Sequence, residues 1–328
     1  MKKPLLVSLA LAAMSVSCLT GCNKDDGKIK IGILQLDFPA VDIAAQGFLA
    51  ELKEAGISYS AIKRAPGGTV TRNELALDLV SRCNYLFGLG TGNSQALKGA
   101  IIEKGKAEKS TLFFSAVTDP VDAGLVQSMD NGRGFVCGTS DMNPVNEQID
   151  LLVECIPTVD KVGIFYTNTE TNSQTQFRLA SAKLRDLGIT VVEQTCTGST
   201  DIKSSIDSLV EVPGLDAIYI PTDNNIADNG TKAVSDAVKD SGILVVCGEA
   251  NMLKECGAVT KSVDYELLGR MTGRMAVSVI KDGVKAKDIP VEIMDPDDCK
   301  FVMSLQNAQS AGVTLPQSVL DKCENLDD

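Results

Sequence analysis

Hydroxyl side chains at the ends of apolar, strand-like runs are the first feature of this chain that could do chemistry. Thr91 lies in the glycine-rich turn Gly88-Leu89-Gly90-Thr91-Gly92, and Ser94 follows where a helical pattern begins. Free backbone amides and hydroxyls at the start of a helix form a seat for a carboxylate. A dinucleotide site is disfavoured because Asn93 breaks the G-x-G-x-x-G spacing. The alternative is that Asn93 or Ser94 only caps the helix.

Acidic residues occupy similar positions after other runs. Asp119 follows Ser115-Ala116-Val117-Thr118, and Asp223 follows Asp216-Ala217-Ile218-Tyr219-Ile220-Pro221-Thr222. Asp119 either accepts hydrogen bonds from a ligand or only starts a turn. Asp223, or Asp264 before another helical pattern, could pair with the ammonium group of a ligand. A plain helix cap is the alternative for each of these two acids.

A third loop, Thr167-Asn168-Thr169-Glu170-Thr171-Asn172-Ser173, is rich in hydroxyl and amide groups. Such a loop suits hydrogen bonding to a small polar solute, and a solvated loop in which Asn172 or Ser173 caps a helix is the alternative. Tyr265 or Phe38 could cover an apolar side chain of the ligand. The loop after the first strand-like run contributes two candidates, Asp37 and Phe38.

Catalysis is disfavoured because the chain contains no histidine. Histidine is the commonest general base, the usual activator of a nucleophile and the commonest zinc ligand. Ser-His-Asp and Cys-His catalysis are therefore excluded, and the chain has no G-x-S-x-G motif. Ser-Lys or paired-carboxylate chemistry stays open, although no motif indicates it. We expect a binding protein without a cofactor rather than an enzyme.

Strand-like runs alternate with helical patterns from Lys28 to about Asp282, which is typical of parallel βαβ units covered by helices. The expected fold class is therefore doubly wound α/β. Lys161-Val162-Gly163-Ile164 begins a strand, loop and helix like those that begin at Lys30-Ile31-Gly32-Ile33, so we expect two lobes of similar build. In open α/β sheets ligands bind outside the carboxyl ends of the strands, which is where the polar loops lie.

The N-terminus has the features of an export signal. Residues 1–21 combine a positive start and a short apolar stretch, and Leu19-Thr20-Gly21-Cys22 resembles the bacterial lipobox. We expect residues 1–21 to be a lipoprotein signal peptide, Cys22 to carry acyl chains and residues 22–27 to be a polar tether. An ordinary secretory signal is the alternative. Either reading places the mature protein outside the cytoplasm, and lipidation would anchor it to a bacterial membrane.

The chain is acidic, with 31 basic and 43 acidic residues and a formal charge of −12. Loss of the leader removes Lys2 and Lys3, which leaves 29 basic against 43 acidic residues and a charge of −14. Such a surface repels nucleic acid, so we expect no nucleic-acid partner.

Eight of the ten cysteines follow Cys22, and an even number in an exported chain permits disulfides. No two of them form a C-x-x-C motif, which disfavours a metal site. Cys247 and Cys256 are the nearest plausible disulfide pair, whereas buried free thiols explain the apolar surroundings of several cysteines equally well.

The chain resembles the bacterial ABC-transporter substrate-binding lipoproteins that are proposed to carry aromatic amino acids such as tryptophan and tyrosine, within the type I periplasmic-binding-protein fold. The resemblance extends from Lys28 to the closing segment 305–313. Its matching stretches are Ile31-Gly32-Ile33-Leu34-Gln35, Phe113-Phe114-Ser115-Ala116-Val117-Thr118-Asp119-Pro120-Val121, Asp216-Ala217-Ile218-Tyr219-Ile220-Pro221-Thr222-Asp223-Asn224 and Val263-Asp264-Tyr265-Glu266-Leu267-Leu268-Gly269.

This resemblance implies two similar lobes joined by a hinge that the chain crosses three times. The first lobe would comprise residues 28–142 and 260–290, and the second would comprise residues 143–259 and 291–328. The implied ligand contacts are Thr91, Ser115, Thr118 and Asp119 of the first lobe and Asn172, Ser173 and Asp223 of the second. The sequence departs from the family at Asp37-Phe38-Pro39, where many relatives have Glu-His-Pro.

The expected function is capture of a small amino-acid-like solute between two lobes that close over it by hinge rotation. The closed protein, acting as a monomer, would deliver the solute to the permease and ATPase subunits of an ABC importer. The alternative is a sensing lipoprotein that passes the closed state to a membrane receptor.

Overall fold

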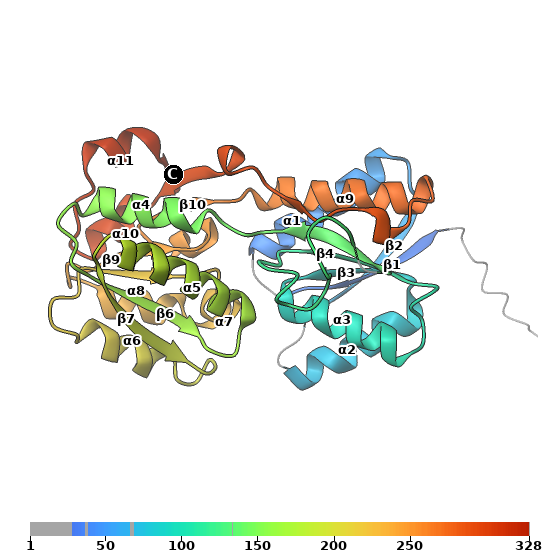
Figure 1. The fold of residues 1–328 in the computed structure, drawn as a ribbon, viewed down its shortest axis with the longest axis horizontal. Helices are drawn as coiled ribbons and strands as arrows, with labels where there is room; N and C mark the ends of the chain where they lie inside the picture. The colour runs from blue at the N-terminus through green and yellow to red at the C-terminus, as the bar shows by residue number, and fades with distance from the viewer. Residues whose placement is uncertain (1–27, 37–38, 66–68, 133, 328) are drawn as a thin grey trace, which may run out of the picture.

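The computed structural model describes residues 28–36, 39–65, 69–132 and 134–327. The chain forms two lobes that lie side by side, each built on one sheet with helices on both faces (Figure 1). These two mostly parallel sheets confirm the expected α/β fold class. In the described part of the chain, no helix has the length and apolar content needed to span a membrane.

The first lobe contains a six-stranded sheet with the order β11-β5-β4-β3-β1-β2, in which all neighbouring strands are parallel. Its elements are β1 (Ile29–Leu34), α1 (Pro39–Glu54), β2 (Tyr59–Arg64), α2 (Thr69–Arg82), β3 (Tyr85–Leu89), α3 (Thr91–Glu103), β4 (Thr111–Ser115), β5 (Val136–Ser140), α9 (Tyr265–Lys281) and β11 (Glu292–Ile293). Ile31 and Ile33 of β1 join the core beneath α1 and α9, whereas Leu34 joins the core beneath α2 and α3. Burial on both faces explains why β1 is a nearly continuous apolar run.

The second lobe contains a seven-stranded sheet with the order β13-β12-β10-β9-β8-β6-β7. Its elements are α4 (Val145–Cys155), β6 (Lys161–Thr167), α5 (Thr171–Asp186), β7 (Thr190–Cys196), α6 (Ile202–Val210), β8 (Ala217–Ile220), α7 (Asn224–Asn229), α8 (Thr231–Val238), β9 (Leu244–Cys247), η1 (Ala250–Lys254), β10 (Val259–Ser262), β12 (Lys300–Met303), α10 (Leu305–Ser310), α11 (Gln317–Lys322) and β13 (Glu324–Asn325). β12 runs antiparallel to β10, and the other paired strands of this sheet are parallel. Short 3-10 turns, η2 (Ala286–Asp288) and η3 (Pro296–Asp298), lie near the last connection between the lobes.

The chain passes between the two sheets at residues 141–144, 263–264 and 294–299. β10 therefore belongs to the second sheet, whereas the division expected at residue 260 placed most of it in the first lobe. β11 belongs to the first sheet, whereas the division expected at residue 291 placed it in the second lobe. Asn143 links the first two passages because its Oδ1 accepts a hydrogen bond of 3.0 Å from the backbone N–H of Val263. The backbone N–H of Asp264 lies 3.4 Å from the sulfur of Met294, which links the second passage to the third.

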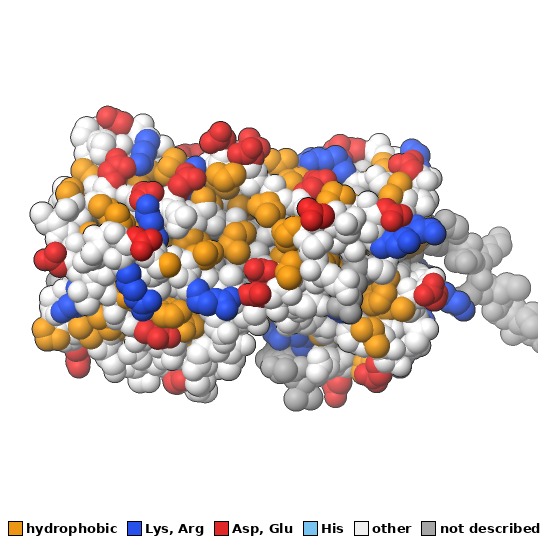
Figure 2. Space-filling view, in the orientation of Figure 1, with side chains coloured by type: hydrophobic (Ala, Val, Ile, Leu, Met, Phe, Trp, Pro, Cys, Tyr) orange, Lys and Arg blue, Asp and Glu red, His pale blue; other side chains and the backbone are white. Residues whose placement is uncertain are grey.

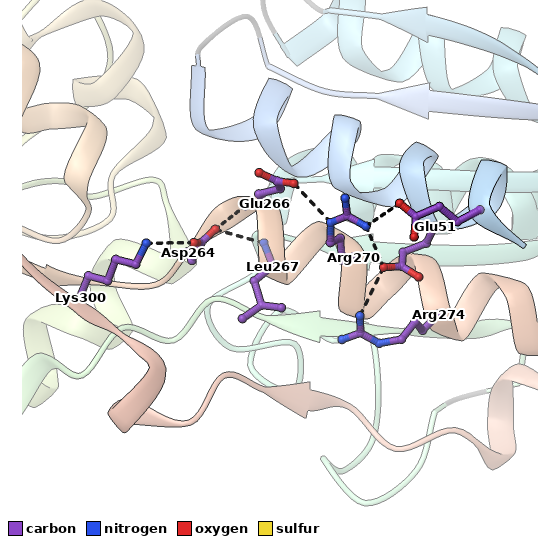
Figure 3. A network of polar contacts seen from close by, with 8 residues as sticks. Glu51, Asp264, Glu266, Leu267, Arg270, Arg274 and Lys300 are labelled. Atoms are coloured by element: carbon purple, nitrogen blue, oxygen red, sulfur yellow. Dashed lines mark hydrogen bonds and ion pairs between the residues drawn. The ribbon is translucent and has the colours of Figure 1, made fainter.

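α9 packs closely against α1, although the two helices are far apart in the sequence. Glycine permits the approach: a Cβ atom built on Gly269 would lie 2.0 Å from the carbonyl oxygen of Ala44. Beside this contact, the Arg270 guanidinium pairs with Glu51 and Glu54 of α1 and with Glu266 of its own helix (Figure 3).

Charged side chains of both signs are interspersed on the face shown in Figure 2. The described residues of that face present no continuous basic area.

Candidate functional site

A cavity of about 110 Å³ lies between the lobes at the carboxyl ends of β3 and β6. Both lobes line it. Ligands of open α/β sheets bind at this edge, outside the carboxyl ends of the strands. The first lobe contributes Leu36, Arg72, Gly90, Thr91, Gly92, Asn93 and Gln95, and the second contributes Thr169, Glu170, Thr171, Asn172 and Asn224. We call this space the outer cavity.

The first-lobe wall of the outer cavity combines the start of α3 with an arginine. Gly90 precedes the helix with φ 89°, and no side chain caps the first turn of α3. Ser94 holds the turn from inside, since its hydroxyl lies 3.1 Å from the Gly88 carbonyl and 2.9 Å from the Gly90 carbonyl. The uncapped amides and the Arg72 guanidinium therefore favour an anionic group at this wall.

Arg72 is positioned by the packing of α2 against α3. A Cβ atom on Gly92 would lie 2.7 Å from the Nη1 atom of Arg72, so the missing side chain makes room for the guanidinium. The Nε–H of Arg72 is buried and has no hydrogen-bond acceptor. A planar guanidinium with an unused donor suits a carboxylate.

The second-lobe wall is acidic and centres on Glu170. Its carboxylate accepts hydrogen bonds from the side-chain amide of Asn224 at 2.7 Å, from the backbone N–H groups of Asn224 and Asn225 at 3.0 and 2.9 Å, and from Asn172 at 3.1 Å. Burial raises the pKa of Glu170 to about 7, and the negative charge of Asp223 adds to this rise. The outer cavity therefore has a cationic side and an acidic side.

Asp223 lies behind this wall and is buried, with 1% of its surface exposed. Its carboxylate accepts four hydrogen bonds, from the backbone N–H and hydroxyl of Thr167 at 2.7 and 2.8 Å, from the hydroxyl of Ser173 at 2.7 Å and from the backbone N–H of Ile226 at 2.9 Å. These bonds stabilise the charged form, but burial dominates and raises the pKa of Asp223. Asp223 thus joins β6, α5 and α7 at one point.

A second space, the inner cavity, lies nearer the hinge and measures about 10 Å³. Its lining residues are Val41, Ala116, Asp141, Thr222, Asp223, Asn224, Ala227, Glu249 and Tyr265. Asn224 borders both cavities. Asp141 accepts hydrogen bonds from the Thr118 hydroxyl at 3.2 Å and from the Tyr265 hydroxyl at 3.0 Å.

Stability should depend on pH through Asp141. Burial raises its pKa from 3.8 to about 6, so the folded state retains a proton that the unfolded state has lost between these two pH values. The contribution of Asp141 to the free energy of unfolding is therefore greatest at low pH, and it falls by about 3 kcal/mol at most as the pH rises through this window. Asp141→Asn should flatten the change between pH 4 and 7 in urea unfolding, and a variant with the wild-type pH profile would contradict this assignment.

The structure places the other candidates away from the two cavities. Ser115 is fully buried, with its hydroxyl 3.0 Å from that of Thr139. Asp119 accepts hydrogen bonds from the backbone N–H groups of Val121 and Asp122 at 3.0 and 2.8 Å, as a turn residue does. Asp264 accepts from the backbone N–H groups of Glu266 and Leu267 and pairs with Lys300 at 3.5 Å (Figure 3). The candidates Cys22, Asp37 and Phe38 lie outside the described residues.

Cys247 and Cys256, proposed as a disulfide pair, are buried free thiols whose sulfur atoms lie 4.0 Å apart. In the described part of the chain, no group of three or more acidic, cysteine or histidine side chains is arranged to hold a metal ion.

Sequence reasoning did not select Arg72, Glu170 and Glu249 as site residues. Glu170 and Glu249 do stand after strands β6 and β9, so their positions carried the same signal as that of Asp223. Arg72 lies within the first turn of α2, and the sequence around it gives no sign that α3 will pack beside it.

Comparison with known proteins adds family relationships to this geometry. A "Tyrosine-binding protein" of Clostridioides difficile is 28% identical, with 94% of this chain and 99% of the relative covered. A Streptococcus pneumoniae ABC domain in complex with L-Trp matches with a TM-score of 0.82, 28% identity and coverage of 91% and 99% of the two chains. A ligand-free, open substrate-binding protein with adhesive properties from Clostridium difficile has the same identity and coverage but a TM-score of 0.68.

The family model for ABC transporter substrate binding proteins matches residues 30–326, which is nearly the whole described chain. This family consists of binding proteins and not of enzymes, in agreement with the expectation from the missing histidine. The chain therefore belongs to the ABC transporter substrate binding protein family.

Proposed function

We propose that this protein captures a small amino acid, of the aromatic class, between its lobes and delivers it to the permease of an ABC importer. The observation that carries the proposal is the outer cavity, in which Arg72 lines one wall and Glu170 the other. A zwitterion presents one charge of each sign, so it complements a cavity with a cationic side and an acidic side.

The carboxylate of the ligand would lie against Arg72 and the uncapped start of α3, and its amino group would face the acids of the second lobe. The two charged groups of the ligand, both attached to its α-carbon, would then contact different lobes. Closure is favoured only by contacts that exist in the closed state, so a ligand of this kind would hold the lobes together.

Two comparisons support an aromatic amino acid and a closed arrangement. One relative is named for tyrosine and another was solved with L-Trp, each at 28% identity to this chain. The higher TM-score with the L-Trp complex than with the ligand-free, open protein, at equal identity and coverage, indicates lobes arranged as in the complex. Arg178 of α5 also reaches across to Asp122 of the first lobe, at 2.6 Å.

The proposal includes export and attachment. Leu19-Thr20-Gly21-Cys22 supports acylation of Cys22, which would hold the capture protein beside its permease at the outer face of the membrane. A sensing lipoprotein would need the same leader and the same cavity. Uptake of radiolabelled amino acid by cells that lack the gene distinguishes the two functions, because a transport role predicts lost uptake and a sensing role predicts normal uptake.

The direct test is a thermal-shift panel of the twenty amino acids on a chain of residues 23–328. A ligand at 100 times its dissociation constant should add about 2.7 kcal/mol to the free energy of unfolding. Stabilisation by no amino acid would overturn the proposal.

Replacement of Arg72 by methionine should weaken binding of the amino acid found in that panel by about 10- to 100-fold, because a hydrogen bond to a charged group contributes about 1.5 to 3 kcal/mol. Arg82→Met is the matched control: Arg82 lies on the same helix but pairs with Asp78 at the surface, so its loss should leave affinity unchanged. Isothermal titration calorimetry measures both affinities, and equal affinities would remove Arg72 from the site.

A further inference from the structure

Asp122 of the first lobe makes a contact that joins the two lobes outside the cavities. Its Oδ2 atom accepts a hydrogen bond of 2.6 Å from the Nη2 atom of Arg178 and one of 3.1 Å from the hydroxyl of Thr175, both on α5 of the second lobe. The Nη2 atom of Arg178 also donates to the Thr175 hydroxyl, at 2.8 Å. None of these three residues lines the outer or the inner cavity. We call this set of contacts the latch.

The first-lobe side of the latch is fixed by its own turn. Asp119 accepts a hydrogen bond of 2.8 Å from the backbone N–H of Asp122, and the Gln95 side chain of α3 donates to the carbonyl of Ala123 at 3.0 Å. Leu125 anchors the end of the turn, because it is fully buried in the first-lobe core. The backbone that carries Asp122 is therefore ordered before the lobes meet, which lowers the entropy lost when the latch forms.

The second-lobe side of the latch lies on one face of α5. Asn172, Thr175 and Arg178 follow one another at intervals of three residues, which places them on the same face of the helix. Asn172 lines the outer cavity. Phe177 stacks on Tyr166 of β6, with ring centroids 5.0 Å apart, and so fixes α5 to its own sheet. Formation of the latch therefore draws the second-lobe wall of the outer cavity toward the first lobe.

The latch acts only when the lobes are together. Side chains on separate lobes lose their contact when the lobes part, so each bond of the latch favours the closed arrangement. The side chains of Arg178 and Asp122 are 63% and 43% exposed, so water solvates both charges once they separate, and the ion pair alone contributes little. The hydroxyl of buried Thr175 donates to the same oxygen, which makes the latch stronger than an isolated surface pair.

We propose that Asp122, Thr175 and Arg178 keep part of the ligand-free protein closed and thereby set ligand affinity from outside the cavity. The inference goes beyond the proposed function, which attributes closure to the ligand. The apparent dissociation constant varies inversely with the fraction of protein that is competent to bind, so a latch that raises the closed fraction tightens binding. Asp119, a ligand candidate from the sequence, then acts one step away as a positioning residue for Asp122.

Reversal of the charges across the latch tests the inference. Asp122→Lys and Arg178→Glu each set like charges opposite one another. Each should weaken binding of the amino acid found in the thermal-shift panel by about 5- to 20-fold, because an ion pair and a hydrogen bond are lost. The double variant Asp122→Lys/Arg178→Glu restores a pair of opposite charges and should recover affinity to within about 3-fold of wild type, as coupled residues do. Isothermal titration calorimetry measures all four proteins.

Small-angle X-ray scattering of ligand-free protein gives a second readout, which does not depend on the proposed function. The radius of gyration should be larger in either single variant than in wild type. Wild-type protein should itself expand between about 0.1 and 1 M NaCl, as the screening length falls from about 10 to about 3 Å. Asp130→Lys is the matched control: Asp130 is exposed on the same connection between β4 and β5, and its replacement should leave affinity and dimensions unchanged.

The two readouts separate failure of the latch from failure of the proposed function. Unchanged affinity and dimensions in both single variants, or a double variant that binds no better than the single ones, would overturn the latch and leave the proposed function standing. The salt series on wild-type protein needs no substitution, so constant dimensions there would overturn the latch even if the variants fold poorly. Expansion in salt and on charge reversal, in a protein that binds no amino acid, would support the latch and overturn the proposed function.

Discussion

Gly269→Ala should lower the free energy of unfolding by about 3 kcal/mol, the upper part of the range for overpacking a core. The new Cβ atom would lie 2.0 Å from the Ala44 carbonyl oxygen and 2.8 Å from its Cα atom. Both are backbone atoms of α1, so no side chain can turn away to make room. Relief requires α9 to move off α1, which would pull Phe48 and Leu268 out of a shared core.

Urea unfolding measures this effect, and Gly99→Ala is the control. Gly99 lies within helix α3, and a Cβ atom there would meet no atom within 4 Å. The same substitution should therefore stabilise the protein by about 0.5 to 1 kcal/mol, because alanine loses less conformational freedom than glycine in a helix. Destabilisation of similar size at both positions would show that helix propensity, and not the α1–α9 contact, determines the result.

Asp223→Ala should cost about 3 to 5 kcal/mol of stability, since each buried donor left without an acceptor costs about 1 to 3 kcal/mol. The backbone N–H groups of Thr167 and Ile226 would lose their partner, and so would the hydroxyl of Ser173. Asp223→Asn should cost less, because its amide oxygen can still accept hydrogen bonds. Denaturant unfolding of the two variants gives both values.

Asp201→Ala provides the comparison for this prediction. Asp201 also accepts hydrogen bonds from two backbone N–H groups, those of Thr197 and Gly198 at 2.9 and 3.0 Å, but water can reach its loop. Its replacement should cost much less. If Asp223→Ala kept wild-type stability and lost only ligand affinity, Asp223 would be a ligand contact and not a support of the second-lobe wall.

The fold was predictable because β-branched runs and helical patterns alternate regularly along the chain. The strands β10 and β12 of the second sheet were not predictable in this way. β10 reads Val-Thr-Lys-Ser, with a single apolar residue and so no apolar run, and β12 pairs with it in the antiparallel direction. Pairing between segments so far apart depends on tertiary contacts that local pattern does not encode.

The location of the site was also predictable, since the polar loops mark the carboxyl ends of the strands. The roles of individual side chains were not, because each role depends on which hydrogen bonds the neighbours have already made. Ser173 and Asp223 were separate candidates in the sequence, but β6 and β8 are adjacent strands and bring the two into contact at 2.7 Å. Asn251 donates to one oxygen of Glu249 and the other oxygen has no partner, a difference that no sequence pattern indicates.

The three passages between the sheets have a consequence for biosynthesis. A chain that emerges from its amino end makes α1 early, but the helix that covers it, α9, begins only at residue 265. The first lobe to be synthesised therefore cannot complete its core until most of the second lobe has been made, and the second lobe in turn awaits β12 and β13. A truncated chain that ends before residue 265 would leave the Phe48 side of α1 exposed to solvent. Such a chain should be recognised by chaperones and proteases and should not persist as a folded first lobe.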